Sequence, residues 1–596
     1  MVHLKNIRKN LLCHIVLLVC VVQCTNLHPS APKIKEGSWY FSETEGATLR
    51  AKVERSGQSF GIATQGTGAT VAAKKMFELG GNAADAAAAA SFAISVERPQ
   101  STGLGGGGFL LYYHPSLKNG PVSFDFREMA PSKADAKMYL DEKGEIIPDK
   151  SLTGIHAVGV PGLVAGVVKF HRRFGKLALP VILAPAISMA EEGIVVYPEL
   201  ADAIKGEASR LLMFPASKAL FFKAGQPLKV GDILKQPDLA ETLKAIAKKG
   251  EAGFYSGSVA KKIANYSKTL GWPITLEDLQ GYLVKEREPV SANFGDYTLY
   301  SMGPPSSGGT HIAQILGMSY GLLNPSAGPM NTENIHVVAS AMQMAFYDRA
   351  RYLGDPDFVH VPLKTLISKN YLKDLQGRIT LDAVHKADAF AQWPDAFHFK
   401  AKTESDQTTH FSILTKEGEA VVSTQTINGH FGSAIVVPGT GVVLNNEMDD
   451  FAAKVGASNL FGAIGGENNL PVGKKRPLSS MSPTLVFKKG LPVLALGTPS
   501  GTRILTCVAQ TVINRLIYGL DLYDSVALLR YHQQWMPDKL YVEARGLPKE
   551  QYDGLTKKGH VIETKDIGCR IQAVELNGGK VNAVSDPRGE GSAYAL

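Results

Sequence analysis

The sequence from position 400 to 414 reads Lys-Ala-Lys-Thr-Glu-Ser-Asp-Gln-Thr-Thr-His-Phe-Ser-Ile-Leu. Residues 400–407 are polar, which is typical of an exposed connector. After this connector the side chains alternate like those of a strand, residues 416–419 can turn, and residues 420–428 continue as a second strand. The pattern predicts a β-hairpin that begins at Thr408, and an ordinary linker before an ordinary hairpin is the alternative interpretation.

The turn decides which residues face each other across this hairpin. If it centres on residues 417–418, the numbers of facing residues sum to about 835. Thr408 then lies opposite Ile427, and its diagonal neighbours Thr426 and Asn428 come within reach of its side chain. A shift of the register by one residue is the alternative. The hairpin is therefore expected to place a hydroxyl and an amide beside Thr408.

Thr408 becomes a good nucleophile only if the chain is cut before it. A threonine inside a chain has no base attached, but cleavage of the Gln407–Thr408 bond frees an α-amine. An α-amine with a pKa of roughly 7.7–8.0 is partly neutral near pH 7 and can take the hydroxyl proton. The same hydroxyl could make the cut by attacking the Gln407 carbonyl, which leaves an ester for water to hydrolyse.

The composition is that of a soluble globular protein. Of the 596 residues, 44% are hydrophobic and 20% are charged. The net charge of +8 is modest and no basic stripe accompanies it, which argues against a nucleic-acid partner. The densest basic run, residues 474–476 (Lys-Lys-Arg), is expected to be a solvated turn.

Residues 1–24 predict an export signal. Lys5, Arg8 and Lys9 form a basic start, and the apolar run 11–22 is shorter than the roughly 20 residues that a transmembrane helix needs. A buried N-terminal helix and a lipoprotein signal ending at Cys24 are the alternatives. Loss of the segment removes three positive charges, so that the net charge falls from +8 to about +5.

The remaining cysteines, Cys507 and Cys569, are 62 positions apart, which matches no metal-binding spacing. They could pair in an oxidising compartment, but we expect two buried thiols. The 15 histidines show no metal-binding spacing either. The glycine run 105–108 lacks the Gly-x-x-x-x-Gly-Lys-Ser/Thr pattern of a phosphate-binding loop, and no Gly-x-Ser-x-Gly elbow is present. The sequence predicts no metal site and no nucleotide site.

Apolar spacing predicts helices alternating with strands. Residues 163–174 form an amphipathic pattern that stops near Gly175, and residues 237–250 form a second one. Residues 83–96 are mostly alanine, which predicts a helix packed closely against a sheet. These helices need no functional explanation.

The hairpin sequence 406–412 (Asp-Gln-Thr-Thr-His-Phe-Ser) resembles the processing site of the γ-glutamyltransferase family of N-terminal nucleophile hydrolases. Further resemblances follow in the order the family has them, from about residue 60 to about residue 590. They are residues 80–86 (Gly-Gly-Asn-Ala-Ala-Asp-Ala), 105–109 (Gly-Gly-Gly-Gly-Phe), 125–131 (Asp-Phe-Arg-Glu-Met-Ala-Pro), 304–309 (Pro-Pro-Ser-Ser-Gly-Gly), 444–451 (Leu-Asn-Asn-Glu-Met-Asp-Asp-Phe), 477–484 (Pro-Leu-Ser-Ser-Met-Ser-Pro-Thr) and 585–588 (Ser-Asp-Pro-Arg). Each motif is moderately specific, and the ordered set is very specific.

The resemblance implies roles for the hairpin and for a later glycine loop. Thr408 would attack the γ-amide carbon of the donor and carry the γ-glutamyl group as an ester, while Thr426 orients the new terminus. Residues 496–501 (Leu-Gly-Thr-Pro-Ser-Gly) occupy the position of the family's oxyanion hole, where backbone N–H groups of Ser500 and Gly501 would hold the tetrahedral oxygen. The family usually has Gly-Gly where this chain has Ser500 and Gly501.

The resemblance also implies a clamp for the α-amino-acid head of the donor. Arg127 would bind the α-carboxylate through its planar fork. Hydroxyl groups of Ser479 and Ser480 would add donors to that carboxylate. The α-ammonium group would be received by Asn428, Glu447 and Asp450.

A lid is expected over this pocket, in residues 459–466 (Asn-Leu-Phe-Gly-Ala-Ile-Gly-Gly). A tyrosine is common in the family where Phe461 stands, and its hydroxyl can reach the asparagine that matches Asn428. Phenylalanine keeps the apolar cover but loses this latch. We therefore expect a lid that opens more easily and more hydrolysis relative to transfer.

Similarity to this family implies an α+β fold, a four-layer αββα sandwich. Residues 25–407 would form the large subunit and residues 408–596 the small subunit of a heterodimer that shares this fold. The enzyme would be exported to a periplasmic or extracellular location, would need no cofactor or metal, and would act on glutathione or glutamine-like amides with water, amino acids or peptides as acceptors. A cephalosporin-type β-lactam acylase and an unprocessed, inactive secreted homologue are the alternatives.

Overall fold

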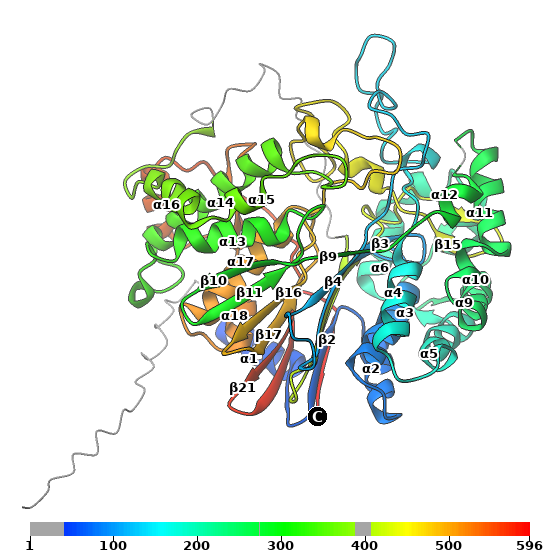
Figure 1. The fold of residues 1–596 in the computed structure, drawn as a ribbon, viewed down its shortest axis with the longest axis horizontal. Helices are drawn as coiled ribbons and strands as arrows, with labels where there is room; N and C mark the ends of the chain where they lie inside the picture. Colours follow the sequence, from blue (N-terminus) through cyan, green and yellow to red (C-terminus); the bar gives the residue numbers. More distant parts are fainter. Residues whose placement is uncertain (1–40, 273, 388–406) are drawn as a thin grey trace, which may run out of the picture.

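Two stacked β-sheets form the centre of the molecule, and helices cover both outer faces (Figure 1). The computed structural model describes residues 41–272, 274–387 and 407–596. The predicted export signal and residues 400–406 of the predicted connector lie outside these ranges. The layers follow the order helix, sheet, sheet, helix, so the predicted α+β class and αββα sandwich are confirmed.

Sheet I contains the predicted hairpin as its two central strands. All its neighbouring strands pair antiparallel. Its order is β23 (Ser592–Ala595), β2 (Phe60–Thr64), β12 (Thr409–Thr415), β13 (Ala420–Thr426), β3 (Gly107–Tyr113), β4 (Val122–Phe126) and β9 (Lys285–Arg287).

Sheet II is also antiparallel and has seven strands. Its order is β1 (Glu54–Gly57), β22 (Lys580–Ser585), β21 (Gln572–Asn577), β17 (Leu491–Gly497), β16 (Thr484–Lys488), β11 (Tyr297–Ser301) and β10 (Val290–Phe294). Both sheets mix strands from before and after Thr408. A cut at that position would therefore leave each sheet built from both fragments.

Three apolar layers hold the sandwich together. Between the sheets, Leu111 and Val422 of sheet I belong to one buried cluster with Leu485 and Ala495 of sheet II. A second cluster joins sheet I to its helices, and a third joins sheet II to its own. The helices over sheet I are α2 (Thr67–Glu78), α3 (Ala83–Glu97), α4 (Leu163–Phe174), α5 (Leu179–Glu192) and α9 (Pro237–Lys249); those over sheet II are α13 (Gly308–Ser319), α14 (Thr332–Tyr352), α17 (Arg503–Leu516) and α18 (Leu522–Ala527).

The remaining helices lie around this sandwich. They are α1 (Glu43–Val53), α6 (Pro198–Gly206), α7 (Ala208–Leu211), α8 (Pro215–Phe221), α10 (Ala252–Tyr255), α11 (Ser258–Thr269), α12 (Leu276–Gln280), α15 (Leu363–Leu366), α16 (Lys369–Arg378) and α19 (Lys549–Lys557). No helix in the described part of the chain combines the length and the apolar character needed to span a bilayer.

The alanine-rich helix α3 is buried along nearly its whole length, as its composition predicts. Every residue from Ala83 to Val96 is buried. Small side chains let the helix approach β12 and β13 on one side and neighbouring helices on the other. Its start is fixed by a capping box, in which Asn82 accepts from the Asp85 N–H and Asp85 accepts from the Asn82 N–H. The predicted helices at 163–174 and 237–250 are confirmed as α4 and α9.

The hairpin register differs by one residue from the register predicted with the turn at residues 417–418. Thr409 pairs with Gln425 and His410 with Thr424, so facing numbers sum to 834. The reason is a three-residue turn: Thr415 and Glu419 bond across it, and Gly418 has φ of 91°. The ladder therefore points Thr408 at Thr426 rather than at Ile427.

The basic run at residues 474–476 is only in part the solvated turn that we expected, because Lys474 is exposed in a turn but the two residues after it are not. Lys475 and Arg476 are buried. The Arg476 guanidinium pairs with the carboxylate of Asp125, which directly precedes the segment carrying Arg127, and the Arg476 N–H donates to Asp355 at 2.8 Å. The local sequence could not predict this ion pair, because Asp125 lies some 350 positions away from Arg476.

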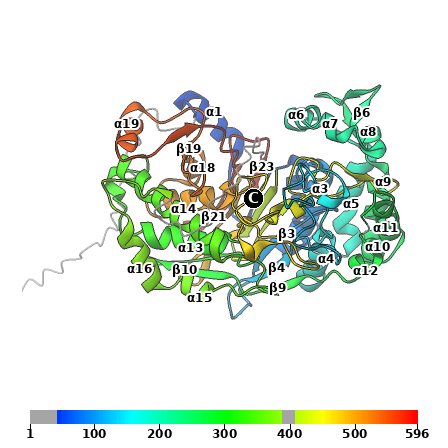
Figure 2. The same cartoon turned by 90° about the horizontal axis from the view of Figure 1, so that it is seen from above.

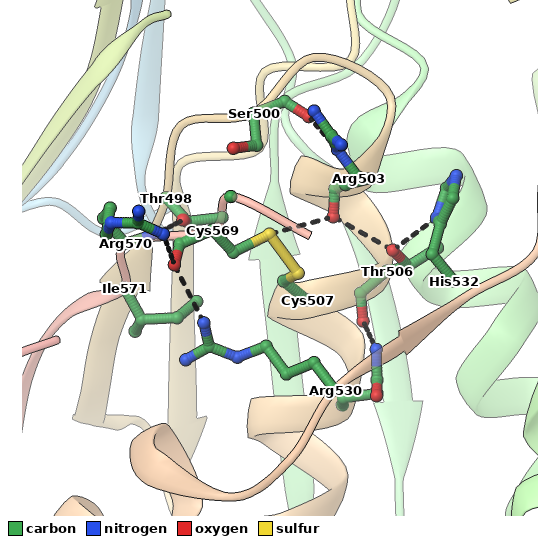
Figure 3. The surroundings of a disulfide bond; sticks show 12 residues. Thr498, Ser500, Arg503, Thr506, Cys507, Arg530, His532, Cys569, Arg570 and Ile571 are labelled. Carbon is green, nitrogen blue, oxygen red and sulfur yellow. Dashed lines mark hydrogen bonds between the residues drawn. A yellow bond between two sulfur atoms is a disulfide. The ribbon is translucent and has the colours of Figure 1, made fainter. Parts of the chain in front are cut away.

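The expectation of two buried thiols is wrong, because Cys507 and Cys569 form a disulfide with an S–S distance of 2.13 Å. Both residues are fully buried. Figure 3 shows the bond joining α17 to the segment that precedes β21, next to the loop that contains Thr498 and Ser500. The cross-link therefore ties together two parts of the predicted small subunit.

Removal of this disulfide should destabilise the protein. A cross-link that closes a loop of about 60 residues restricts the unfolded chain, and its loss typically costs about 2–4 kcal/mol. We expect the double variant Cys507→Ala/Cys569→Ala to unfold at a lower urea concentration than the wild type. Intrinsic fluorescence measures the unfolding of both proteins. An unchanged urea midpoint would show that the cross-link does not contribute to stability.

Candidate active site

The candidate nucleophile lies at the start of β12 and faces the end of β13. The Oγ1 atoms of Thr408 and Thr426 are 3.2 Å apart, within hydrogen-bonding distance, and both side chains are buried. Thr426 Oγ1 also accepts a 2.8 Å hydrogen bond from the Asn428 N–H. That second bond fixes the position of the Thr426 hydroxyl, so the residue can hold the Thr408 hydroxyl in one orientation.

The backbone at the predicted cleavage point is strained. Thr408 has φ of 142°, a region that β-branched residues avoid and that costs on the order of 1–3 kcal/mol. Gln407 is buried, not exposed as the polar connector suggested, because it directly precedes the buried start of β12. The φ angle of Thr408 is defined through the carbonyl carbon of Gln407. Cleavage of the bond between them would therefore release this strain.

The glycine run at residues 105–108 supports the hairpin by close backbone contact. A Cβ atom on Gly105 would lie 2.1 Å from the Val443 carbonyl oxygen, and one on Gly106 would lie 2.0 Å from the Thr426 carbonyl oxygen. No side chain fits at either position. The run therefore holds in place the end of β13 that carries Thr426.

The predicted oxyanion loop connects β17 to α17 and reaches the site through Gly501. Ser500 has φ of 109° and Gly501 has φ of 52°, so both residues adopt backbone angles that favour glycine. A Cβ atom on Gly501 would lie 2.3 Å from the Phe461 ring, which explains why this position must be glycine. Ser500 has a backbone N–H like glycine, but it adopts this strained conformation although it carries a side chain. The Ser500 carbonyl accepts from the Arg503 N–H at the start of α17 (Figure 3).

The predicted clamp residues come together around Arg127, which follows β4 directly. The Arg127 guanidinium pairs with the carboxylates of Glu447 and Asp450 and is buried. Both acidic residues lie in the short helix η4 (Glu447–Asp450). Opposite charges of the kind that a zwitterionic amino-acid head requires are therefore adjacent in the site.

Two buried carboxyl groups in this clamp have raised pKa values. Burial raises the pKa of Glu128 to about 7, against the opposing field of Arg127. Burial also raises the pKa of Glu447 well above its usual value, and the neighbouring carboxylates Glu128 and Asp450 raise it further. The site therefore does not carry the full negative charge that a count of its acidic residues suggests.

Ser479 and Ser480 lie on a loop that is hydrogen-bonded to a turn distant in the sequence. Ser479 pairs with Ser306 as an isolated bridge, and the Ser479 N–H donates to the Pro305 carbonyl at 2.8 Å. The Ser480 hydroxyl accepts from Arg349 Nη2 at 3.4 Å. These contacts bring two segments that resemble the family, 304–309 and 477–484, to one wall of the site.

The predicted lid closes over the site and is held by its neighbours. Asn459 Nδ2 donates to Asp450 at 2.8 Å, and the Leu460 N–H donates to Asp449 at 2.8 Å. The Phe461 side chain is buried against Gly501. Asn428 does not contact the lid through its amide, because its Nδ2 atom donates to the Asn446 carbonyl.

These groups line one cavity. All the predicted site residues except Gln407 and Ser500 reach its wall. The lining residues are Arg127, Arg349, Thr408, Thr426, Asn428, Glu447, Asp450, Asn459, Phe461, Ser479, Ser480, Met481, Gly501, Thr502 and Ile504. The cavity wall thus includes the Thr408 hydroxyl, Gly501 of the predicted oxyanion loop and the charged groups around Arg127.

A family model described as gamma-glutamyltranspeptidase matches residues 69–596. The chain belongs to the gamma-glutamyltranspeptidase family. It is 41% identical over 530 residues to the glutathione hydrolase proenzyme of Escherichia coli (strain K12), which covers 88% of this chain and 90% of that protein.

Solved structures agree with this membership. The gamma-glutamyltranspeptidase of Helicobacter pylori is 42% identical over 54% of this chain and 91% of that chain, with a TM-score of 0.52. A cephalosporin acylase from Bacillus halodurans superposes with a TM-score of 0.78 over 91% of this chain and 97% of that chain, at 24% identity. At that identity the second likeness shows the fold alone.

The sequence predicted no role for Glu128 or Arg349 and gave Asn459 only a place in the lid segment. Glu128 and Asn459 lie inside segments that resemble the family, but the sequence does not show which side chains they contact. Arg349 lies in α14, and its signal is an Asp-Arg pair at the end of a largely apolar helical run. Among the described residues, no group of three or more His, Cys, Asp or Glu side chains is arranged to hold a metal ion.

The raised pKa of Glu128 predicts a pH-dependent stability. In the folded protein Glu128 holds its proton up to about pH 7, whereas in the unfolded chain it loses it near pH 4.3, so its favourable contribution is lost as pH rises through about 7. The variant Glu128→Gln stays neutral. We expect its melting temperature to fall less than that of the wild type between pH 5 and pH 8. The exposed residue Glu142, replaced by glutamine, is the matched control, and equal pH dependence in all three proteins contradicts the prediction.

The lid gives a second prediction. The variant Phe461→Tyr restores the hydroxyl that is common in the family, and should make the lid harder to open. We expect a higher ratio of transfer to hydrolysis, measured as γ-glutamyl-dipeptide formed against glutamate released at fixed acceptor concentration. If the ratio does not change, lid opening does not set the balance between water and acceptor.

Proposed function

We propose that the protein is an autoprocessing γ-glutamyltransferase and glutathione hydrolase. The observation that supports this most strongly is the 3.2 Å contact between the hydroxyls of Thr408 and Thr426 on the wall of a cavity that also contains the Arg127 charge cluster. A nucleophile and a receptor for an α-amino acid are the two parts that the reaction requires. Membership of the gamma-glutamyltranspeptidase family supports the same reaction.

Maturation would begin with an attack by the Thr408 hydroxyl on the carbonyl carbon of Gln407. The C–N bond breaks, the acyl group moves to Thr408 Oγ1, and water then hydrolyses the resulting ester. The products are a carboxylate on Gln407 and a free amine and hydroxyl on Thr408. The strained φ of Thr408 favours this step, because the product no longer has that constraint.

Catalysis would use the new amine as the base for the hydroxyl of the same residue. Thr408 Oγ1 attacks the γ-amide carbon, and backbone N–H groups of the loop at Ser500 and Gly501 hold the oxyanion. The proton passes to the leaving nitrogen as the C–N bond breaks, which leaves a γ-glutamyl ester on Thr408. Water or the amine of an acceptor then attacks the ester and releases glutamate or a new γ-glutamyl amide.

The charge cluster would select the γ-glutamyl group. The α-carboxylate of the donor would contact Arg127, and its α-ammonium would contact the carboxylates of Glu447 and Asp450. Ser479, Ser480 and Asn428 line the same cavity and supply neutral hydrogen-bonding groups. A β-lactam acylase of the same superfamily is expected to lack such a clamp, which argues against the acylase alternative.

The two-subunit form and the location outside the cytoplasm are parts of the same proposal. Both sheets contain strands from before and after Thr408, which supports a stable heterodimer of residues 25–407 and 408–596 after cleavage. The basic and apolar start of the chain and the Cys507–Cys569 disulfide support export to an oxidising compartment. Amino acids or short peptides are the proposed acceptors.

Replacement of the nucleophile tests the mechanism. The wild-type protein should run as two fragments on a denaturing gel, and N-terminal sequencing of the smaller one should give Thr-Thr-His-Phe. The variant Thr408→Ala should remain a single chain and should release no product from γ-glutamyl-p-nitroanilide. The variant Thr408→Ser is the matched control, because it keeps the hydroxyl and should retain measurable cleavage.

Two results would contradict this proposal. An intact wild-type chain that is nevertheless active would exclude the free amine as the base. A smaller fragment that starts at another residue would exclude Thr408 as the nucleophile. An intact and inactive wild-type chain would instead favour the unprocessed homologue.

A further inference from the structure

The guanidinium of Arg127 is already engaged by the protein. One of its terminal nitrogens pairs with Glu447 and the other with Asp450, while Nε donates to the Pro477 carbonyl at 3.4 Å. A third carboxylate, Glu128, lies 3.8 Å from Arg127 Nη1. An incoming carboxylate that approached Arg127 alone would have to displace one of these groups and would meet negative charge on the others.

A second arginine lines the same cavity and has no such partner. Arg349 extends from α14 and is only 4% exposed. Its two hydrogen bonds go to hydroxyls, from Nε to Ser307 Oγ at 3.3 Å and from Nη2 to Ser480 Oγ at 3.4 Å. Within the described residues, no carboxylate oxygen lies within 4.0 Å of its nitrogens, and the preceding Asp348 bonds to other side chains.

This arrangement is unusual among the buried arginines of the molecule. A buried cation without a counter-charge is costly, so proteins normally pair it. Arg98, Arg476, Arg530 and Arg588 each pair with a carboxylate here. Burial lowers the pKa of Arg349 to about 10, which leaves it charged at neutral pH. The cavity therefore contains one positive charge that lacks a direct counter-ion.

The direction of the hydrogen bonds shows how that charge can act. Arg349 is a donor only, so the Ser480 hydroxyl must accept its N–H. A hydroxyl that accepts from a cation keeps its own hydrogen for another acceptor. Ser480 lies on the cavity wall, and so does Ser479 next to it. The pair therefore presents an O–H that is backed by a buried positive charge.

We propose that Arg349 is a positioning residue that supplies positive charge for the α-carboxylate of the donor, acting through the Ser480 hydroxyl. This inference rests on the proposed function, since it assumes an α-amino-acid donor. Arg127 keeps its direct contact with the α-carboxylate and also holds Glu447 and Asp450, which face the α-ammonium. Arg349 adds a second positive charge behind the serine pair.

The test pairs a change in the enzyme with a change in the substrate. The donors are γ-glutamyl-p-nitroanilide and its α-methyl ester, which has no α-carboxylate charge. In the variant Arg349→Met we expect KM for the first donor to rise about ten- to hundred-fold, the range of one hydrogen bond to a charged group, with kcat within about three-fold. For the ester, KM should differ little between the wild type and the variant.

Controls separate this role from a structural one. Arg351 is exposed on the same helix, and among the described residues its side chain donates to Tyr347 and lies over the Tyr352 ring, so Arg351→Met should leave KM unchanged for both donors. The variant Arg349→Lys keeps the charge and should recover much of the KM lost in Arg349→Met. Autocleavage on a denaturing gel checks that each variant matures. If Arg349→Met does not mature, Arg349→Lys is compared with the wild type on the two donors instead.

The outcomes distinguish the inference from the proposed function. If wild-type protein does not hydrolyse γ-glutamyl-p-nitroanilide, the proposed function fails. If it does, but KM rises equally for the charged donor and the ester, Arg349 is structural and the inference fails. Where the ester is hydrolysed too slowly to follow, its inhibition constant against the charged donor gives the same comparison. A KM rise confined to the charged donor supports the inference.

Discussion

The three-residue turn between β12 and β13 is the constraint on which the site depends. An odd number of turn residues sets the register at which Thr408 faces Thr426, and their hydroxyls then meet at 3.2 Å. If the same chain formed a two-residue turn at residues 417–418, Thr408 would face the apolar side chain of Ile427 instead. Gly418 makes the observed turn accessible through its positive φ. A backbone detail some ten residues away thus decides whether the candidate nucleophile has a partner.

The charged part of the cavity follows a different logic, in which local charges balance before any ligand arrives. Arg127 pairs with Glu447 and Asp450, while burial raises the pKa values of Glu128 and Glu447. Burying such a network is costly unless its charges are paired, and both carboxyl oxygens of Glu128 and one of Glu447 have no hydrogen-bond partner among the described residues. A zwitterion could enter it by exchange, since it brings one charge of each sign and leaves the total unchanged. That is a physical reason for a preference for α-amino-acid donors over singly charged acyl groups.

The sequence predicted the layers, the long helices and most of the cavity wall, because these depend on periodicity and on motifs that resemble the family. It could not predict features that depend on distant partners. Arg476 looked like part of a solvated turn until Asp125 was placed beside it, and Cys507 needed the position of Cys569. The predicted hairpin register was wrong for a local reason, because the sequence does not show whether Gly418 belongs to a turn of two residues or of three. Arg349 was missed because a helix pattern treats a buried arginine as a polar residue and carries no information about a missing counter-charge.

Ser500 shows how the fold can maintain a conformation that its own residue disfavours. The serine sits at φ of 109°, where glycine would be unstrained. Its neighbours leave it little freedom: the Phe461 ring packs on Gly501, the Arg503 N–H binds the Ser500 carbonyl, and the Thr498 hydroxyl accepts from the Arg570 N–H. Residue 570 is covalently adjacent to Cys569, so the disulfide anchors the same loop from below (Figure 3). The strain at residue 500 therefore persists because the loop is fixed at both ends.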